Sequence, residues 1–194
     1  MDKKQPLFKP DKDWWNNACL SLYEDQTHTY ISGYQHAVEI LVAHIEEKKT
    51  QQDTLIYPIV FMYRHNFELL LKKIIQTGRF LNENELSLPA HHKLMDLWGE
   101  VKSILKTIEP SFGKSKEAKS IEHVLKELSE IDSNSTTFRY ARTKEGKSSI
   151  SNLRYINVRH LREMLSEPFS TLEGITYMLE NMADAQIEMS DHQY

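Results

Sequence analysis

The amino-acid sequence predicts an all-α protein, organised as a single bundle of six or seven helices. Apolar residues recur at intervals of three and four along most of the chain, as they do on one face of an α-helix. No segment shows the alternation of apolar and polar residues that is typical of a half-buried strand. Six glycines and six prolines in 194 residues also argue against an all-β fold. We therefore expect one helical domain over 1–194, with tails at 1–12 and 190–194.

Two helices are predicted near the N-terminus. Asp13 is a suitable N-cap for a first helix that ends near Asp25. Its apolar face would consist of Trp14, Ala18 and Leu22. The second helix is expected over Thr29–Lys49, where the apolar residues again keep to one face.

The third predicted helix is the most apolar part of the chain. It begins near Thr54, contains the stretch Tyr57–Ile75 and ends at Gly78, a residue type that often terminates helices. Because apolar residues surround this helix almost completely, we expect it at the centre of the fold. The core should then include Phe61, Phe67, Leu71 and Ile75.

The remaining helices follow a loop at Arg79–Pro89. Apolar spacing predicts them at Ala90–Glu109, Lys116–Ile131 and Leu153–Met189. Pro168 interrupts the last of these, so we expect a kink or a break near Ser166. His91 and His92 open the helix that follows the loop, and we interpret them as a solvent-exposed helix start.

Composition excludes several classes of function. A formal net charge of −4 argues against non-specific coating of nucleic acid, although it allows a local basic patch. Cys19 is the only cysteine, which excludes an intramolecular disulfide and a cysteine-based zinc site. No metal-binding motif occurs, so we expect neither a metal nor a cofactor. The N-terminus has no signal-peptide pattern and no apolar stretch is long enough to span a membrane, so we expect a cytoplasmic protein.

Two groups of residues are candidates for function. The first consists of Arg64, His65 and Glu68 within the apolar central helix, where charge is costly unless it is paired. Arg64 and Glu68 are four residues apart and share a helix face, so we expect them to be paired or to share one polar network. They are either a structural ion pair or the floor of a site that binds nucleotide or RNA, with Arg64 contacting phosphate.

The second group lies in the long segment 132–152, which is rich in Ser, Thr and Asn and is predicted to form a loop. Loops of this length in compact domains tend to be functional or disordered. Arg139, Tyr140 and Arg142 combine positive charge with an aromatic ring, a combination that suits phosphate contacts and base stacking. The alternative is a solvated, mobile loop.

The chain resembles the HEPN superfamily (higher eukaryotes and prokaryotes nucleotide-binding). The resemblance rests on the helical content, on the apolar helix that contains Arg64 and His65, and on Arg154 followed after five residues by His160. Members of that superfamily are helical bundles, often dimers, of bacterial toxin, defence and RNA-processing systems. Many are metal-independent endoribonucleases that use an Arg and a His at this spacing. The family usually has Asn, Asp or His directly after the Arg, whereas this chain has Tyr155.

The resemblance implies a cytoplasmic homodimer that binds a nucleotide or RNA and in which Arg154 and His160 cleave RNA without a metal. The remaining nucleotide-binding candidates are Arg64, His65, Glu68, Arg139, Tyr140 and Arg142. The alternative is a non-catalytic helical module that binds a cognate protein partner, in which Arg64 and Glu68 are purely structural.

Overall fold

The apolar stretch forms the central helix of the protein, α2 (Gln52–Glu83). The computed structural model describes residues 6–20, 25–83, 85–151 and 153–191. Phe67, Leu71 and Ile75 have no exposed surface, so their predicted place in the core is confirmed. Phe61 is only half-buried, and its predicted place in the core is wrong because its ring stacks on neighbouring polar side chains at the edge of α2.

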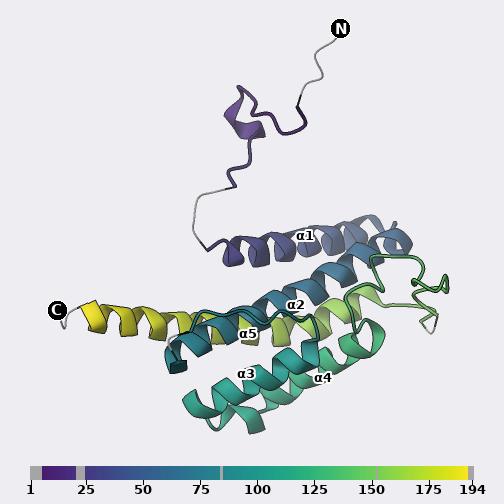
Figure 1. Ribbon diagram of the computed structural model, residues 1–194. Coiled ribbons are helices and arrows are strands. Elements are labelled where there is room, and N and C mark those ends of the chain that lie inside the picture. The colour runs from purple at the N-terminus through teal and green to yellow at the C-terminus, as the bar shows by residue number, and fades with distance from the viewer. Residues whose placement is uncertain (1–5, 21–24, 84, 152, 192–194) are drawn as a thin grey trace.

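Four further helices surround α2 (Figure 1). They are α1 (Thr27–Lys48), α3 (Leu94–Ile108), α4 (Lys116–Ile131) and α5 (Val158–Asp191). Helices α1, α3 and α5 pack on α2, and α4 packs on α3 and α5. The described part of the chain contains these five α-helices, two one-turn 3-10 helices and no strand, which confirms the all-α class with fewer helices than expected.

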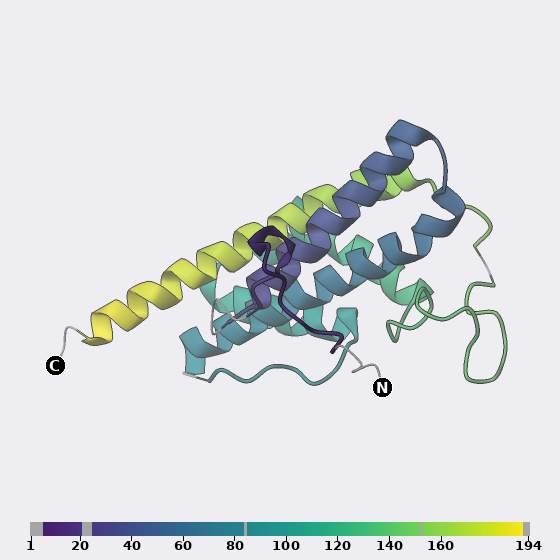
Figure 2. The same cartoon turned by 90° about the horizontal axis from the view of Figure 1, so that it is seen from above.

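The directions of the helices place the α1–α2 and α4–α5 connections at the same end of the bundle (Figure 1). Helices α2, α3 and α5 run in one direction, and α1 and α4 run in the other (Figure 1). The segment after α2 runs back along the bundle, so α3 begins beside the middle of α2 (Figure 2). As a result, the start of α3 and the end of α4 both lie against α2 near Arg64.

The helix predicted over 13–25 does not form in the part of it that the structure describes. Only Trp14–Asn16 makes one 3-10 turn, and residues 21–24 lie outside the described residues. Asp13 accepts a hydrogen bond from the backbone N–H of Trp15, and the Asn17 amide donates to the backbone oxygens of Asp11 and Asp13. Such local bonds compete with helix formation. Trp14 and Trp15 also find no core to bury against, since they are 67% and 92% exposed.

Gly78 does not end α2, which continues to Glu83. A Cβ atom at Gly78 would lie 2.4 Å from Cγ2 of Ile104, so the glycine allows α3 to approach α2 closely. The prediction of a helix C-terminus there is wrong because this glycine serves packing between helices.

Pro168 does not divide the last helix, and the predicted break near Ser166 is wrong. Helix α5 is continuous through the proline, whose ring is buried. Leu165, Phe169 and Leu172 on the same side of α5 belong to the core. We attribute the continuity to this burial, which outweighs the one helical hydrogen bond that proline removes.

Helix α3 contributes the largest buried side chain, Trp98, which has no exposed surface. Its ring contacts Phe112 edge to face, and its indole N–H donates to Glu122 of α4 at 3.2 Å. Trp98 therefore joins α3, α4 and the turn between them. No helix in the described residues is both long enough and apolar enough to cross a membrane.

Candidate functional site

Arg64 is buried at the point where three segments meet. Its side chain donates from Nε to the backbone oxygen of Asp132 at 2.9 Å, and from Nη2 to the backbone oxygen of His92 at 2.8 Å. The third nitrogen, Nη1, lies 3.2 Å from Oε2 of Glu68, which confirms the predicted pairing. With all three nitrogens engaged and 1% of the residue exposed, Arg64 presents no face to a phosphate.

Glu68 is the buried acceptor at the centre of this network. Its Oε1 accepts a hydrogen bond from Lys72 at 2.9 Å and lies 2.6 Å from Nδ1 of His92. Burial raises the pKa of Glu68, but the hydrogen bonds from His92 and Lys72 and the charges of these residues together lower it by a larger amount. The pKa of Glu68 is therefore below its ordinary value. Glu68 is therefore a carboxylate at neutral pH.

His92 is a member of the network that the sequence did not reveal. The side chain is 63% exposed, in line with a solvent-exposed helix start, yet Nδ1 is held by the buried carboxylate of Glu68. A carboxylate only accepts, so Nδ1 of His92 donates this hydrogen bond. His92 and Glu68 are far apart in the sequence, and no local sequence pattern predicts their contact.

His65, Arg139 and Tyr140, three of the predicted binding residues, do come together. The ring of His65 stacks on Phe61, with centroids 5.7 Å apart and planes at 9°. Tyr34 of α1 meets the other side of His65 edge to face, at 4.8 Å. The guanidinium of Arg139 lies 5.6 Å from the ring centroid of Phe61 and 5.5 Å from that of Tyr140. We call these five residues, from Tyr34 to Tyr140, the aromatic ladder.

The long loop is folded more regularly than its composition predicts. Asp132 is buried and its Oδ1 accepts from the backbone N–H groups of Thr136 and Thr137, which fixes the start of the loop. Residues 141–149 form a small hairpin in which the N–H of Thr143 donates to Lys147 at 2.8 Å. Gly146 supplies the positive φ, 78°, that the turn requires. Arg142 donates to the backbone oxygen of Gly146 across this turn.

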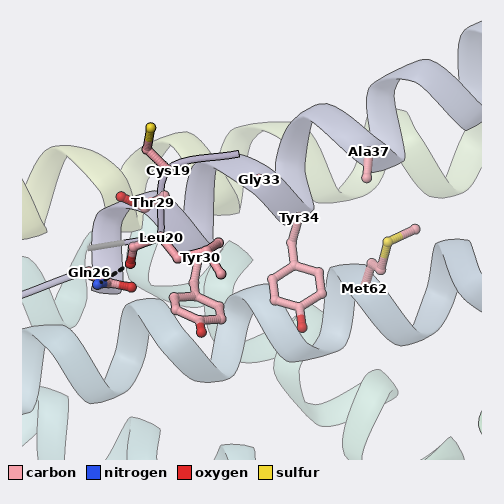
Figure 3. A pocket seen from close by; sticks show the side chains of 9 residues that line it. All are labelled: Cys19, Leu20, Gln26, Thr29, Tyr30, Gly33, Tyr34, Ala37 and Met62. Atoms are coloured by element: carbon pink, nitrogen blue, oxygen red, sulfur yellow. Dashed lines mark hydrogen bonds between the residues drawn. The ribbon is translucent and has the colours of Figure 1, made fainter. Parts of the chain in front are cut away.

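A cavity lies at each end of the aromatic ladder. The first, about 490 Å³, is enclosed by the hairpin, the start of the loop and Tyr57 of α2, and Tyr140 and the buried Phe138 line it. The second, about 540 Å³, is an apolar groove between α1 and α2. Figure 3 shows Tyr30 and Tyr34 projecting into it from α1 toward α2, with Met62 on the opposite side. Both volumes are in the range of small-ligand sites.

Arg154 and His160 lie on the surface at the start of α5. Arg154 is exposed in the segment before the helix, and His160 is exposed in its first turn, where its backbone N–H donates to Oδ1 of Asn157 at 3.1 Å. Neither residue lines the two cavities of the ladder. The structure of one copy therefore does not place Arg154 and His160 in a common pocket.

Positive charge is concentrated around this end of the bundle. Residues 139–162 contain seven Lys and Arg and one Glu, a net charge of +6, so the rest of the chain carries −10. Arg162 and Arg159 are partly neutralised by Glu46 of α1, at 3.0 and 4.0 Å. Among the described residues, no three His, Cys, Asp or Glu side chains lie close enough together to hold a metal ion.

Comparison of the chain with protein-family models, with curated proteins and with solved structures gives no match.

Replacing Glu68 with Ala should destabilise the protein by about 3–5 kcal/mol, because Arg64 and Lys72 would lose the charge that compensates them. Urea denaturation of the variant measures the effect. Glu127→Ala on the exposed face of α4 is the control and should change the stability by less than about 0.5 kcal/mol. Equal midpoints for Glu68→Ala and the unmodified protein would show that the network contributes nothing to stability.

The protein should become less stable as the pH is lowered, partly because of His65. Burial lowers the pKa of His65 below its ordinary value of 6.5. As the pH falls below 6.5, the unfolded chain binds a proton at this residue more readily than the folded one does, so stability decreases until the folded pKa is passed. His65→Phe retains the stacking and removes the proton. Its stability, measured from pH 8 to 5, should decline less steeply, and parallel curves would refute this assignment.

Proposed function

We propose that this protein binds a nucleotide, free or within single-stranded RNA, on the surface formed by the aromatic ladder and the basic segment 139–162. One observation carries the proposal. The guanidinium of Arg139 lies over the rings of Phe61 and Tyr140, beside a cavity of about 490 Å³, in the most basic part of an acidic chain.

Stacking supports this ligand class. Proteins that bind single strands use aromatic rings and Arg planes as platforms for bases, and Tyr140 and Tyr57 are 59% and 47% exposed at the cavity. In the ladder, Arg139 lies over Phe61, which is itself stacked on His65, so the platform exists before the ligand arrives. Such preorganisation reduces the entropy lost on binding.

Charge supports it as well. Lys144, Lys147 and Arg154 are exposed near the cavity, within the segment of net charge +6. Cations spaced along a surface of this kind contact successive phosphates of a strand. The buried Arg64 and Glu68 would act indirectly, by holding the start of the loop in place.

RNA cleavage of the HEPN type is the more specific form of the proposal. In this reaction the RNA 2′-hydroxyl attacks the adjacent phosphate, His160 moves protons and Arg154 stabilises the charge that develops. Because both side chains are exposed in one copy, we propose that a second copy encloses them in a homodimer. A non-catalytic module for a protein partner is the second candidate, favoured by the wholly internal Arg64–Glu68 pair.

Binding is tested with fluorescein-labelled single-stranded RNA, by anisotropy, with nucleoside monophosphates as competitors. Tyr140→Ala and Arg139→Ala should each cost about 1–3 kcal/mol, the value of one stacked base. Tyr177→Ala is the matched control, since this tyrosine is 70% exposed on α5 and lies outside the ladder. Equal losses for Tyr140→Ala and Tyr177→Ala, or unchanged affinity in Tyr140→Ala, would refute the site.

The salt dependence of the same binding tests the phosphate contacts. Lys147→Ala should reduce the slope of log K against log salt by about 0.7, whereas Lys126→Ala on α4 should leave it unchanged.

Cleavage is tested separately, in EDTA. The purified protein should cut single-stranded RNA and leave a cyclic phosphate or a 3′-phosphate. Arg154→Ala and His160→Ala should each abolish cutting, because the reaction requires both side chains and neither is effective without the other. His123→Ala, on the exposed face of α4 and outside the basic segment, is the control that should still cut. Cutting that persists in His160→Ala, or the absence of cutting with a monomeric protein, would rule out this mechanism and leave the binding proposal standing.

A further inference from the structure

Helix α5 carries a second apolar row that the bundle does not cover. Beside the residues that enter the core, α5 has four methionines, Met164, Met178, Met182 and Met189, which are 36–68% exposed. The row is regular, since its members follow one another in alternating steps of four and three residues. They are Met164, Pro168, Thr171, Ile175, Met178, Met182, Ala185 and Met189.

This spacing is the one by which a helix packs against another helix along its length. Alternating steps of four and three keep side chains on a single seam that faces a partner. The core face of α5 uses different residues, among them Leu165, Leu172 and Leu179, each following the last by seven positions. The methionine row is therefore not needed to attach α5 to its own bundle, except at the buried Pro168 and Ile175.

The charge of α5 indicates the chemistry of the partner. Residues 163–191 contain seven acidic residues and no Lys or Arg. They are Glu163, Glu167, Glu173, Glu180, Asp184, Glu188 and Asp191. Of these, Glu180 is paired with Lys73 and His28. Acidic residues in the last turns oppose the helix dipole, so helix stability does not account for them.

The position of this surface leaves it accessible. The last turns of α5 project beyond the ends of α2 and α3, as both views of the protein show (Figures 1 and 2). Met178, Met182 and Met189 lie in the second half of α5, away from the hairpin and from the start of the helix, so a partner bound to them is compatible with RNA at the other end.

We propose that the methionine row and the carboxylates beside it bind a basic amphipathic helix of a partner protein. Apolar side chains of that helix pack on the methionines, whose flexible thioethers adapt to varied partners. Its Lys and Arg face Glu167 and Glu188, which directly precede the row members Pro168 and Met189 and therefore flank the seam. A second copy of this chain fits less well, because pairing α5 with itself brings two acidic helices together.

The test uses the full chain and a fluorescein-labelled amphipathic helical peptide of Leu and Lys. A scrambled peptide of the same composition keeps the charge and loses the apolar face, and a Leu and Glu peptide keeps the apolar face and reverses the charge. Only the Leu and Lys helix should bind tightly. Binding of the scrambled peptide with equal affinity would overturn the proposal in favour of attraction by charge alone, and the absence of binding would overturn it outright.

Variants locate the contact. Met178→Gln with Met182→Gln should weaken peptide binding by about tenfold or more, as expected for the centre of an interface. Ile40→Gln, at a residue of α1 that is 68% exposed, is the matched control and should bind as the unmodified chain does. Circular dichroism checks that both variants remain helical. Unchanged peptide affinity in the double methionine variant overturns the assignment.

Glu167→Gln with Glu188→Gln tests the charge and should reduce both the affinity and its salt dependence. Unchanged values for this variant would contradict the predicted basic partner. Sedimentation of the chain alone tests whether a second copy of the chain occupies the surface instead. A dimer that the double methionine variant abolishes, and that the peptide does not compete with, would show that a second copy occupies the surface and would overturn the proposal.

Discussion

The geometry of the candidate site depends on the burial of one guanidinium, that of Arg64. A buried cation is costly unless every donor finds an acceptor, and Arg64 meets this requirement with Glu68 and with two backbone carbonyls from different segments. Those carbonyls belong to His92, just before α3, and to Asp132, just after α4. The charge of one side chain thus determines where two loops cross α2. Because Asp132 begins the loop, its position also determines where Arg139, seven residues further on, meets Phe61.

The two proposed surfaces follow from a separation of charge along the molecule. The net charge of +6 over residues 139–162 lies at one end of the bundle, and the seven acidic residues of 163–191 follow directly on α5. The arrangement is the reverse of what the dipole of α5 favours, since Arg159 and Arg162 stand in the first turns and acidic residues in the last. These charges destabilise α5, the longest helix described. We infer that the charge at each end of α5 serves interactions outside the bundle.

Patterns within one helix were predictable from the sequence, and contacts between helices were not. Lys116–Ile131 was predicted to the residue from its apolar period, which is a local signal. Phe61 was misplaced because its apolar neighbours hide the fact that it lies on the edge of α2, where Arg139 covers it. Gly78 was read as a helix end because its packing against α3 depends on tertiary structure. The contact of His92 with Glu68 of α2 has no sequence signature. The contacts of the aromatic ladder likewise join residues that are far apart in the sequence, so local patterns do not predict them.

The placement of the three tryptophans has an optical consequence. Trp98 is sealed in the core between α3 and α4, whereas Trp14 and Trp15 are exposed on a single turn outside the bundle. The intrinsic fluorescence of the protein is therefore the sum of a short-wavelength emitter that iodide cannot reach and a pair of long-wavelength emitters that it quenches. When iodide quenches Trp14 and Trp15, the remaining emission comes from Trp98 and reports on the α3–α4 contact. The emission that iodide removes reports on binding near the N-terminal turn.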